Sequence, residues 1–155
     1  MARRRGDGQR RILTYGTYDL FHLGHVRLLA RARALGDMLI VGLSTDEFNA
    51  VKGKTCVMPF EQRRVMLEAC RHVDLVIPET CWEQKQSDVV DHGVDTFVMG
   101  DDWAGKFDGL KALCDVVYLP RTPDISTTEL KRRIVTYRQL YLSSSEPDAI
   151  LQATA

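Results

Sequence analysis

The stretch Leu13-Thr-Tyr-Gly16-Thr-Tyr-Asp-Leu-Phe-His22-Leu-Gly-His25 decides the fold of this chain of 155 residues. An apolar run over residues 11–15 ends at Gly16, and a helical pattern opens after a short polar turn. A strand that leads straight into a helix brings the unpaired N–H groups of the first helical turn to one point, together with the positive end of the helix dipole. The stretch therefore predicts an anion-binding site, with His22 and His25 at the helix entrance.

Glycine and histidine give this predicted site its chemistry. Gly16 and Gly24 lack a Cβ, so the backbone can come close to a ligand. His22 and His25 are three residues apart, which places two imidazoles on one helical face, where they can hold one group together. Each histidine could instead be a helix cap or a core residue. A zinc pair is less favoured, because no third cysteine or histidine stands at ligand spacing.

The composition indicates one globular domain. Hydrophobic residues make up 45% of the sequence and charged residues 27%, and the formal net charge is zero. These values give no general attraction to nucleic acid or to an anionic membrane. No run approaches the ~20 apolar residues that a membrane span needs. The four cysteines show neither CxxC nor zinc spacing, which favours reduced thiols in a cytoplasmic protein.

The two ends differ from the middle of the chain. We expect residues 1–10 to form a flexible arginine-rich tail, with a phosphate-attracting or partner-binding arm as the alternative. No apolar segment follows these arginines, so the tail does not have the pattern of a secretory signal. Residues 11–142 are expected to form the folded domain, and residues 143–155 a small, polar and flexible tail.

Hydrophobic periodicity predicts an α/β fold. Strands are expected at residues 11–15, 38–43, 73–77, 96–99 and 116–119, and helices at 23–35, 59–71, 83–92, 109–114 and 126–141, with loops at 45–57 and 101–108. Strands that alternate with helices form a doubly wound parallel sheet of five strands, covered by helices on both faces. The polar motifs all follow strands, so they gather at the carboxyl edge of the sheet.

Two motifs carry a family resemblance. The stretch from Gly16 to His25 resembles the HxGH signature of the nucleotidyltransferase superfamily in its cytidylyltransferase form, and Arg121-Thr-Pro-Asp-Ile-Ser-Thr-Thr128 resembles the second signature, RTxGISTT. The blocks at 44–49, 82–85 and 98–108 resemble those of bacterial glycerol-3-phosphate cytidylyltransferases. The resemblance covers residues 11 to 135. It implies a Rossmann-like three-layer fold, a homodimer, and Mg²⁺ bound together with CTP.

The resemblance also implies a nucleotide site. His22, His25, Lys54 and Arg121 would be the catalytic residues, the histidines holding the nucleotide phosphates and stabilising a pentacoordinate transition state. The implied CTP-binding residues, these four included, are Thr17, Tyr18, His22, Leu23, Gly24, His25, Lys54, Asp102, Arg121, Ile125, Ser126, Thr127 and Thr128. The residue types suit this role, since Ser126 to Thr128 stand at a predicted helix N-terminus and arginine has forked donors. A plain Ser/Thr cap is the alternative.

A second set of residues matches positions that contact the acceptor substrate in the family. These residues are Lys52, Lys85, Arg63, Arg71 and Trp82. A lysine offers a point charge to an anionic alcohol phosphate. Without the resemblance, Lys52 and Lys54 read as a solvated pair, the arginines as exposed positions of one helix, and Trp82 as a packing residue.

Three aspartates are less determined. Asp19 could orient a histidine, hold a metal ion, or form an Asx turn before the helix. Asp102, after the fourth strand, could contact Mg²⁺ or ribose hydroxyls, or belong to a polar turn. Asp124 stands where the family has glycine. A carboxylate beside a triphosphate is repulsive, although aspartate tolerates left-handed backbone better than most residues.

The expected reaction is transfer of CMP from CTP to sn-glycerol 3-phosphate, giving CDP-glycerol and pyrophosphate by in-line attack, for a wall or surface polymer. The alternatives are cytidylyl transfer to phosphoethanolamine or phosphocholine, adenylyl transfer as in other HxGH proteins, and a non-catalytic nucleotide-binding module. A zwitterionic acceptor would call for a carboxylate or aromatic pocket, whereas Lys52 and Lys85 favour an anionic one.

Overall fold

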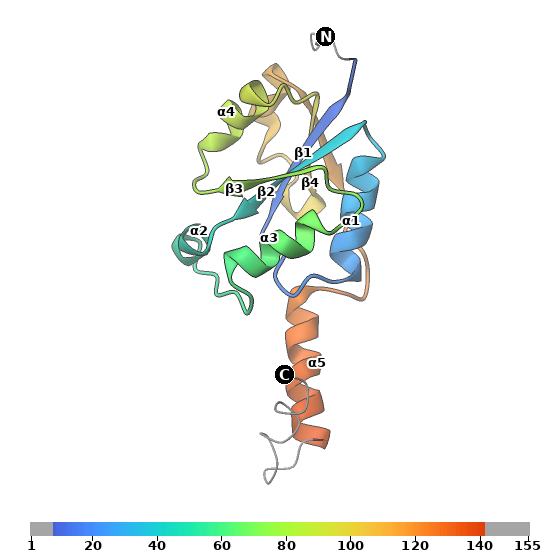
Figure 1. Cartoon of the computed structure of the whole chain (residues 1–155), viewed down its shortest axis with the longest axis vertical. Coiled ribbons are helices and arrows are strands. Elements are labelled where there is room, and N and C mark those ends of the chain that lie inside the picture. The colour runs from blue at the N-terminus through green and yellow to red at the C-terminus, as the bar shows by residue number, and fades with distance from the viewer. Residues whose placement is uncertain (1–7, 142–155) are drawn as a thin grey trace.

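Five parallel strands form the centre of the molecule (Figure 1). The computed structural model describes residues 8–141, so residues 1–7 of the expected N-terminal tail and all of the expected tail at 143–155 lie outside the described part. The strands are β1 (Arg11–Gly16), β2 (Met38–Ser44), β3 (Leu75–Glu79), β4 (Thr96–Gly100) and β5 (Asp115–Leu119). Their order in the sheet is β3-β2-β1-β4-β5, which confirms the Rossmann-like topology expected.

Helices connect the strands and cover both faces of the sheet. They are α1 (Leu23–Arg33), α2 (Asp46–Val51), α3 (Phe60–Glu68), α4 (Gln84–Asp91) and α5 (Thr127–Tyr141), with 3₁₀ turns η1 (Asp101–Trp103) and η2 (Asp108–Ala112). The chain enters the sheet in the middle, at β1, fills one side with β2 and β3, and then crosses to β4 and β5. The connection therefore reverses direction between β1 and β4, where ligands bind in such sheets.

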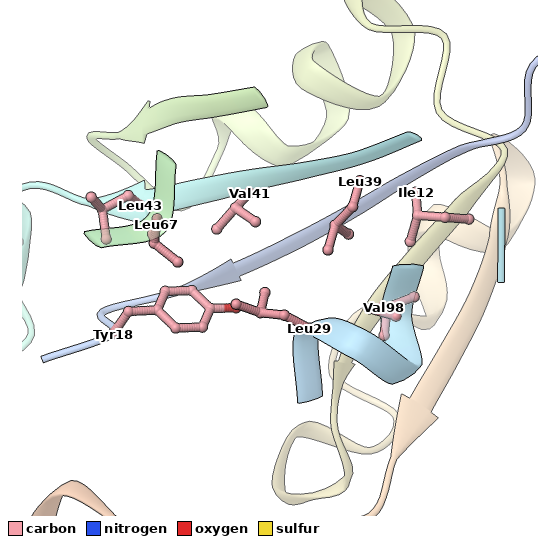
Figure 2. Close-up of a cluster of buried hydrophobic side chains, with 9 residues drawn as sticks. Ile12, Tyr18, Leu29, Leu39, Val41, Leu43, Leu67 and Val98 are labelled. Atoms are coloured by element: carbon pink, nitrogen blue, oxygen red, sulfur yellow. The ribbon is translucent and has the colours of Figure 1, made fainter. Parts of the chain in front are cut away.

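The core has two halves, one on each face of the sheet. Leu29 of α1 and Leu67 of α3 pack on one face, against strand side chains such as Val41 (Figure 2). Val89 of α4 and Leu110 of η2 pack on the other face. Because β1 and β2 are covered on both sides, their residues read as continuous apolar runs rather than as alternating ones.

Aspartates satisfy the backbone at the amino edge of the sheet. Asp37, Asp74 and Asp95 each stand directly before a strand. Their carboxylates accept hydrogen bonds at 2.8 Å from the backbone N–H groups of Arg10, Leu39 and Arg11, respectively. The first N–H groups of a parallel strand have no ladder partner at this edge, and a buried N–H without a partner is costly. The amino edge is thus fixed by structural carboxylates, and the carboxyl edge is left for ligands.

Several elements differ from the sequence expectation, among them the short helix expected at 109–114, which is the 3₁₀ turn η2. The loop expected at 45–57 contains α2, which begins where the Thr45 hydroxyl accepts a hydrogen bond from the Phe48 N–H. The strand expected to end before Pro78 continues to Glu79, because β3 is an edge strand and tolerates a proline. The loop expected at 101–108 contains the 3₁₀ turn η1.

Helix α5 leaves the body of the molecule after its first turn (Figure 1). As expected, Ser126 caps it, since its hydroxyl accepts a hydrogen bond from the Glu129 N–H. The helix contains no buried residue, and apolar side chains such as Ile134 and Tyr137 are exposed. Within residues 8–141, no helix is long and apolar enough to cross a membrane.

Candidate active site

A cavity of about 1110 Å³ opens at the carboxyl edge of the sheet, where the chain reverses direction. Its walls come from four segments that are far apart in the sequence: residues 15–31, residues 54–56, residues 99–103 and residues 119–133. Both signature motifs therefore face the same cavity. The carboxyl ends of parallel strands meet at one edge, so this convergence follows from the topology that the sequence predicted.

His22 and His25 stack face to face at the start of α1, with ring centroids 3.7 Å apart and planes 22° apart. His22 is the N-cap residue, and its Nδ1 accepts a hydrogen bond from the Gly24 N–H at 3.0 Å. His25 Nδ1 accepts from the His22 N–H at 3.3 Å. Since both Nδ1 atoms are acceptors, each neutral ring carries its proton on Nε2. The imidazoles thus cap the helix and offer two N–H donors to a ligand.

This arrangement refines the sequence prediction of an anion site made of free backbone N–H groups. Two N–H groups at the helix start already donate to the rings, so the anion donors presented are the Nε2–H groups themselves. Burial lowers the pKa of His22. The pKa of His25 is lowered to about 3, mainly by burial and in addition by repulsion from His22. Both rings are neutral at pH 7 and act as hydrogen-bond donors.

We predict that acid destabilises the protein through His25. The folded-state pKa lies below the ordinary 6.5, so the unfolded state binds the proton better, and the stability contributed by the neutral ring is lost as the pH falls from about 6.5 toward about 3. Thermal unfolding between pH 7 and pH 5 measures this. Glutamine at position 25 keeps the capping acceptor without titrating, so His25→Gln should lose less stability over this range than the wild type. An equal loss would contradict the prediction.

The second signature lies directly against the histidines. His22 Nε2 is 3.4 Å from the Thr127 hydroxyl, which donates to the Asp19 carbonyl oxygen at 3.1 Å. Ser126 caps α5 at the same point. The start of α1 and the start of α5 therefore meet at one point of the cavity, which suits the anion site predicted from the two motifs.

Within the described part of the chain, five cations and four carboxylates line the cavity. Lys54 is exposed and lines the cavity, as does Arg121, whose guanidinium donates to Asp102 at 3.2 Å. Three further cations line the cavity and were not identified from the sequence: Arg31, Lys131 and Arg133. Lys131 and Arg133 stand on α5, four and six residues after Thr127 of the second signature. Their position just beyond this motif was the feature of the sequence that could have identified them as residues of the site. A triphosphate entering the cavity meets several cations.

The remaining predicted nucleotide residues have different surroundings. Thr17, Gly24, Ile125 and Thr128 line the cavity, whereas Leu23 is half exposed and does not. A Cβ on Gly24 would lie 2.8 Å from the His22 ring, so glycine is required there by the ring itself.

Tyr18 lines the cavity through its backbone. Its ring is buried in the core and lies edge-on to His25, at 5.2 Å between centroids. The backbone adopts a left-handed φ of 51°. The hydroxyl is buried with the ring in the core, so of the two contacts that Tyr18 could make to a nucleotide, through its hydroxyl or through its backbone, only the backbone contact fits this structure.

Asp19 holds a loop in place. Its carboxylate accepts hydrogen bonds from the N–H groups of Val57 and Met58 at 2.8 and 2.9 Å, and it lies 3.4 Å from Lys131. Burial alone would raise the pKa of Asp19, but these donors and Lys131 lower it overall. With both oxygens accepting from the protein, Asp19 fits the role of anchoring the loop that carries Lys54, and it does not fit a metal ligand. Among the described residues, no group of three or more His, Cys, Asp or Glu side chains could hold a metal ion.

The two lysines that the resemblance implied for the acceptor lie in an aromatic box beside the cavity. Lys52 Nζ lies 4.4 Å from the centre of the Phe48 ring, and Lys85 Nζ lies 4.5 Å from that of Tyr15. The indole of Trp82 covers both ammonium groups, at 5.6 and 4.8 Å. Tyr15 also lines the main cavity, so the box adjoins the histidine site. The structure brings together three of the five residues that the resemblance implied for the acceptor.

The two arginines of that set lie elsewhere. Arg71 is exposed beyond the end of α3, not on the helix as expected, and is not among the residues that line the cavity. Arg63 is fully buried and joins segments of the chain. Its guanidinium donates to the carbonyl oxygens of Met58, Thr17 and Ser44 at 3.0, 2.8 and 2.8 Å, and to the Asp46 carboxylate. Arg63 therefore shapes the site from behind, and the expectation that it contacts the acceptor does not fit its burial.

Asp124 adopts the left-handed backbone that explains the glycine of the family motif. Its φ is 63°, and the residue lines the cavity. We predict that Asp124→Gly lowers the KM for CTP, because glycine adopts this conformation without strain and a repulsive carboxylate is removed. Two unit charges 4 Å apart in water interact by about 1 kcal/mol, so the expected change is about fivefold. Asp124→Asn removes the charge but keeps a side chain on the left-handed backbone. If it lowers the KM for CTP as much as Asp124→Gly does, the effect is due to charge. If neither variant lowers the KM, the prediction is wrong.

The fold and the paired signatures define a nucleotidyltransferase-type site, and comparison with known proteins agrees. The chain belongs to the cytidylyltransferase-like family, whose profile matches residues 13–133. It is similar to the glycerol-3-phosphate cytidylyltransferases of Bacillus subtilis and Staphylococcus aureus, at 58% identity over 125 residues, which cover 81% of this chain and 97% and 95% of those proteins.

More distant proteins are similar to this chain in sequence or in structure. The ethanolamine-phosphate cytidylyltransferase of Mus musculus is 34% identical over 151 residues, which cover 92% of this chain and 37% of that protein. Among solved structures, a lipopolysaccharide core biosynthesis protein from Thermoplasma volcanium has a TM-score of 0.64 at 22% identity, covering 74% of this chain and 99% of that one. This structural likeness supports the fold.

Proposed function

We propose that the protein transfers CMP from CTP to sn-glycerol 3-phosphate, producing CDP-glycerol and pyrophosphate. The observation that carries the proposal is that two sites lie next to each other. The stacked histidines contact the second signature in the cavity, and the lysine box adjoins the same cavity through Tyr15. The relatives at 58% identity act as support, since their names state this acceptor.

The chemistry follows from the geometry of the donors. A phosphate oxygen of the acceptor attacks the α-phosphorus of CTP and the bond to pyrophosphate breaks, so the protein needs no covalent nucleophile. Its task is to position two anions and to neutralise the charge on the pentacoordinate phosphorus. The Nε2–H groups of His22 and His25 donate hydrogen bonds to the α-phosphate, while Lys54 and Arg121 neutralise the charge of the leaving pyrophosphate.

The acceptor assignment rests on charge. Two ammonium groups within one box attract the phosphate of an acceptor and favour a substituent without positive charge, such as glycerol, whereas the ammonium of phosphoethanolamine or phosphocholine would be repelled there. Transfer to those acceptors remains the second candidate, because the ethanolamine-phosphate cytidylyltransferase of mouse shares 34% identity with this chain.

Three further features are part of the proposal. Mg²⁺ would enter with CTP and neutralise the triphosphate, held mainly by phosphate oxygens and water, with Asp102 as a carboxylate of the cavity wall that could contact it. A homodimer is part of the proposal through the resemblance to the family. A reducing compartment, the cytoplasm, suits four cysteines that are all free thiols.

Pyrophosphate release tests the proposal directly. Each of the four nucleoside triphosphates is combined with glycerol 3-phosphate, phosphoethanolamine, phosphocholine and a sugar 1-phosphate. Release with CTP and glycerol 3-phosphate is the expected result. Release with CTP and another acceptor would favour the second candidate, and release with ATP would indicate adenylyl transfer. If no combination releases pyrophosphate although the protein binds CTP, it is a nucleotide-binding module without catalytic activity.

A further inference from the structure

Glu79 is a buried carboxylate that joins the two lysines of the aromatic box. It ends β3 and is paired in register with Ser44, the last residue of β2. One carboxylate oxygen, Oε1, accepts a hydrogen bond from Lys85 Nζ at 2.6 Å. The other, Oε2, lies 3.6 Å from Lys52 Nζ and accepts from the Ser44 hydroxyl. Lys52 also donates to that hydroxyl at 2.8 Å.

The charges in this cluster do not cancel. The side chains of Lys52, Lys85 and Glu79 are 10%, 5% and 3% exposed, so two cations share one anion almost out of contact with water. Buried charge is costly unless it is paired. The faces of Phe48 and Tyr15 stabilise the ammonium groups in part. The cluster keeps one positive charge in excess, which an incoming anion can neutralise.

The groups that face Lys52 determine whether it stays charged. Burial lowers its pKa most strongly, and the neighbouring ammonium groups of Lys54 and Lys85 lower it further. Glu79 acts in the opposite direction, as a charge and as a hydrogen-bond acceptor. Burial raises the pKa of the Tyr15 hydroxyl, which donates to Asp88, so this phenol stays neutral. Glu79 is thus the group that opposes loss of a proton from Lys52.

We propose that Glu79 is a positioning residue that holds the ammonium groups of Lys52 and Lys85 side by side, so that the box accepts the phosphate of a dianionic monoester. The inference rests on the proposed function and adds a specificity-determining residue that lies in neither signature motif. It also explains why Ser44 is fully buried at the end of β2, since its hydroxyl links Lys52 to the carboxylate.

The test replaces the carboxylate by its neutral isostere, Glu79→Gln, and measures both KM values at pH 7 and pH 9. A phosphate monoester is already dianionic above about pH 7, so the charge of the acceptor stays constant. The KM for glycerol 3-phosphate should rise about tenfold with pH in the variant and less than about twofold in the wild type, because a titrating lysine loses its charge in this range. The KM for CTP should stay unchanged. Glu83→Gln removes an exposed carboxylate nearby and is the matched control.

A merely structural role for Glu79 would raise both KM values without this pH dependence, and that result, or a flat acceptor profile, overturns the inference. Glu79→Asp keeps the charge on a shorter side chain. It should raise the acceptor KM and keep the wild-type pH profile, which provides a test if the glutamine variant does not fold; an unchanged acceptor KM overturns the inference. Absence of wild-type turnover with glycerol 3-phosphate overturns the proposed function itself, and the Glu79 inference with it.

Discussion

Replacing His22 by alanine should lower kcat by at least about two orders of magnitude, since removal of one preorganised donor to a transition-state oxyanion has an effect of this size. The structure gives the reason. His22 Nδ1 is occupied by the Gly24 N–H, so Nε2 carries the proton and is directed at the second signature, 3.4 Å from the Thr127 hydroxyl. Steady-state kinetics with CTP and the acceptor found by pyrophosphate release measure the effect.

The alanine variant also removes the cap of α1, and a second variant separates the two roles. Asparagine caps helices as well as any residue but cannot reach the α-phosphate with an imidazole N–H. His22→Asn should therefore lose kcat as His22→Ala does, while its melting temperature stays nearer that of the wild type. His72→Ala, outside the cavity, is the control for histidine loss as such. A kcat close to the wild-type value in His22→Asn would show that the imidazole is not the phosphate donor.

Replacing Arg63 by methionine should produce the largest loss of stability. The fully buried guanidinium donates to three carbonyl oxygens and to the carboxylate of Asp46. Methionine fills similar space but leaves the three carbonyl oxygens without a donor. Each buried polar group left unpaired costs about 1–3 kcal/mol, so the loss should reach about 3 kcal/mol or more, or roughly 10 °C in melting temperature. Thermal and urea unfolding measure the change. Turnover should fall as well, because the carbonyl of Thr17 is released at the cavity wall.

Arg64 provides a matched control, because it is the next residue of α3 and makes ion pairs with Glu61 and Glu68 at the surface. Exposed pairs contribute little to stability, so Arg64→Met should leave the melting temperature near that of the wild type. If the two variants unfold at the same temperature, then the hydrogen bonds of Arg63 do not connect the loops around the site as we describe.

The sequence by itself determined the fold and the position of the nucleotide site. Continuous apolar runs separated by amphipathic segments admit a parallel sheet with helices on both faces, and the strand order confirmed it. His22 and His25 could be placed because the strand, the turn and the helix that hold them are contiguous. The second signature could be placed at the same edge because it also follows a strand.

Short elements were less predictable. Helix α2 has six residues, too few to show periodicity, although Thr45 followed by two acidic residues was a readable start signal. The strand position of Pro78 depended on β3 being at the edge of the sheet, which the strand order decides.

The tertiary structure alone decided which charged residues face a ligand and which face the protein. From the sequence, Arg63 was expected to contact the acceptor and Asp19 was a candidate metal ligand. In the structure, both side chains instead form hydrogen bonds to backbone groups of neighbouring loops. Glu79 lies in no motif and gains its place only because β2 and β3 end side by side. The physical reason is that local sequence fixes the direction of one element, whereas the burial and partners of a charge depend on segments that meet only after folding.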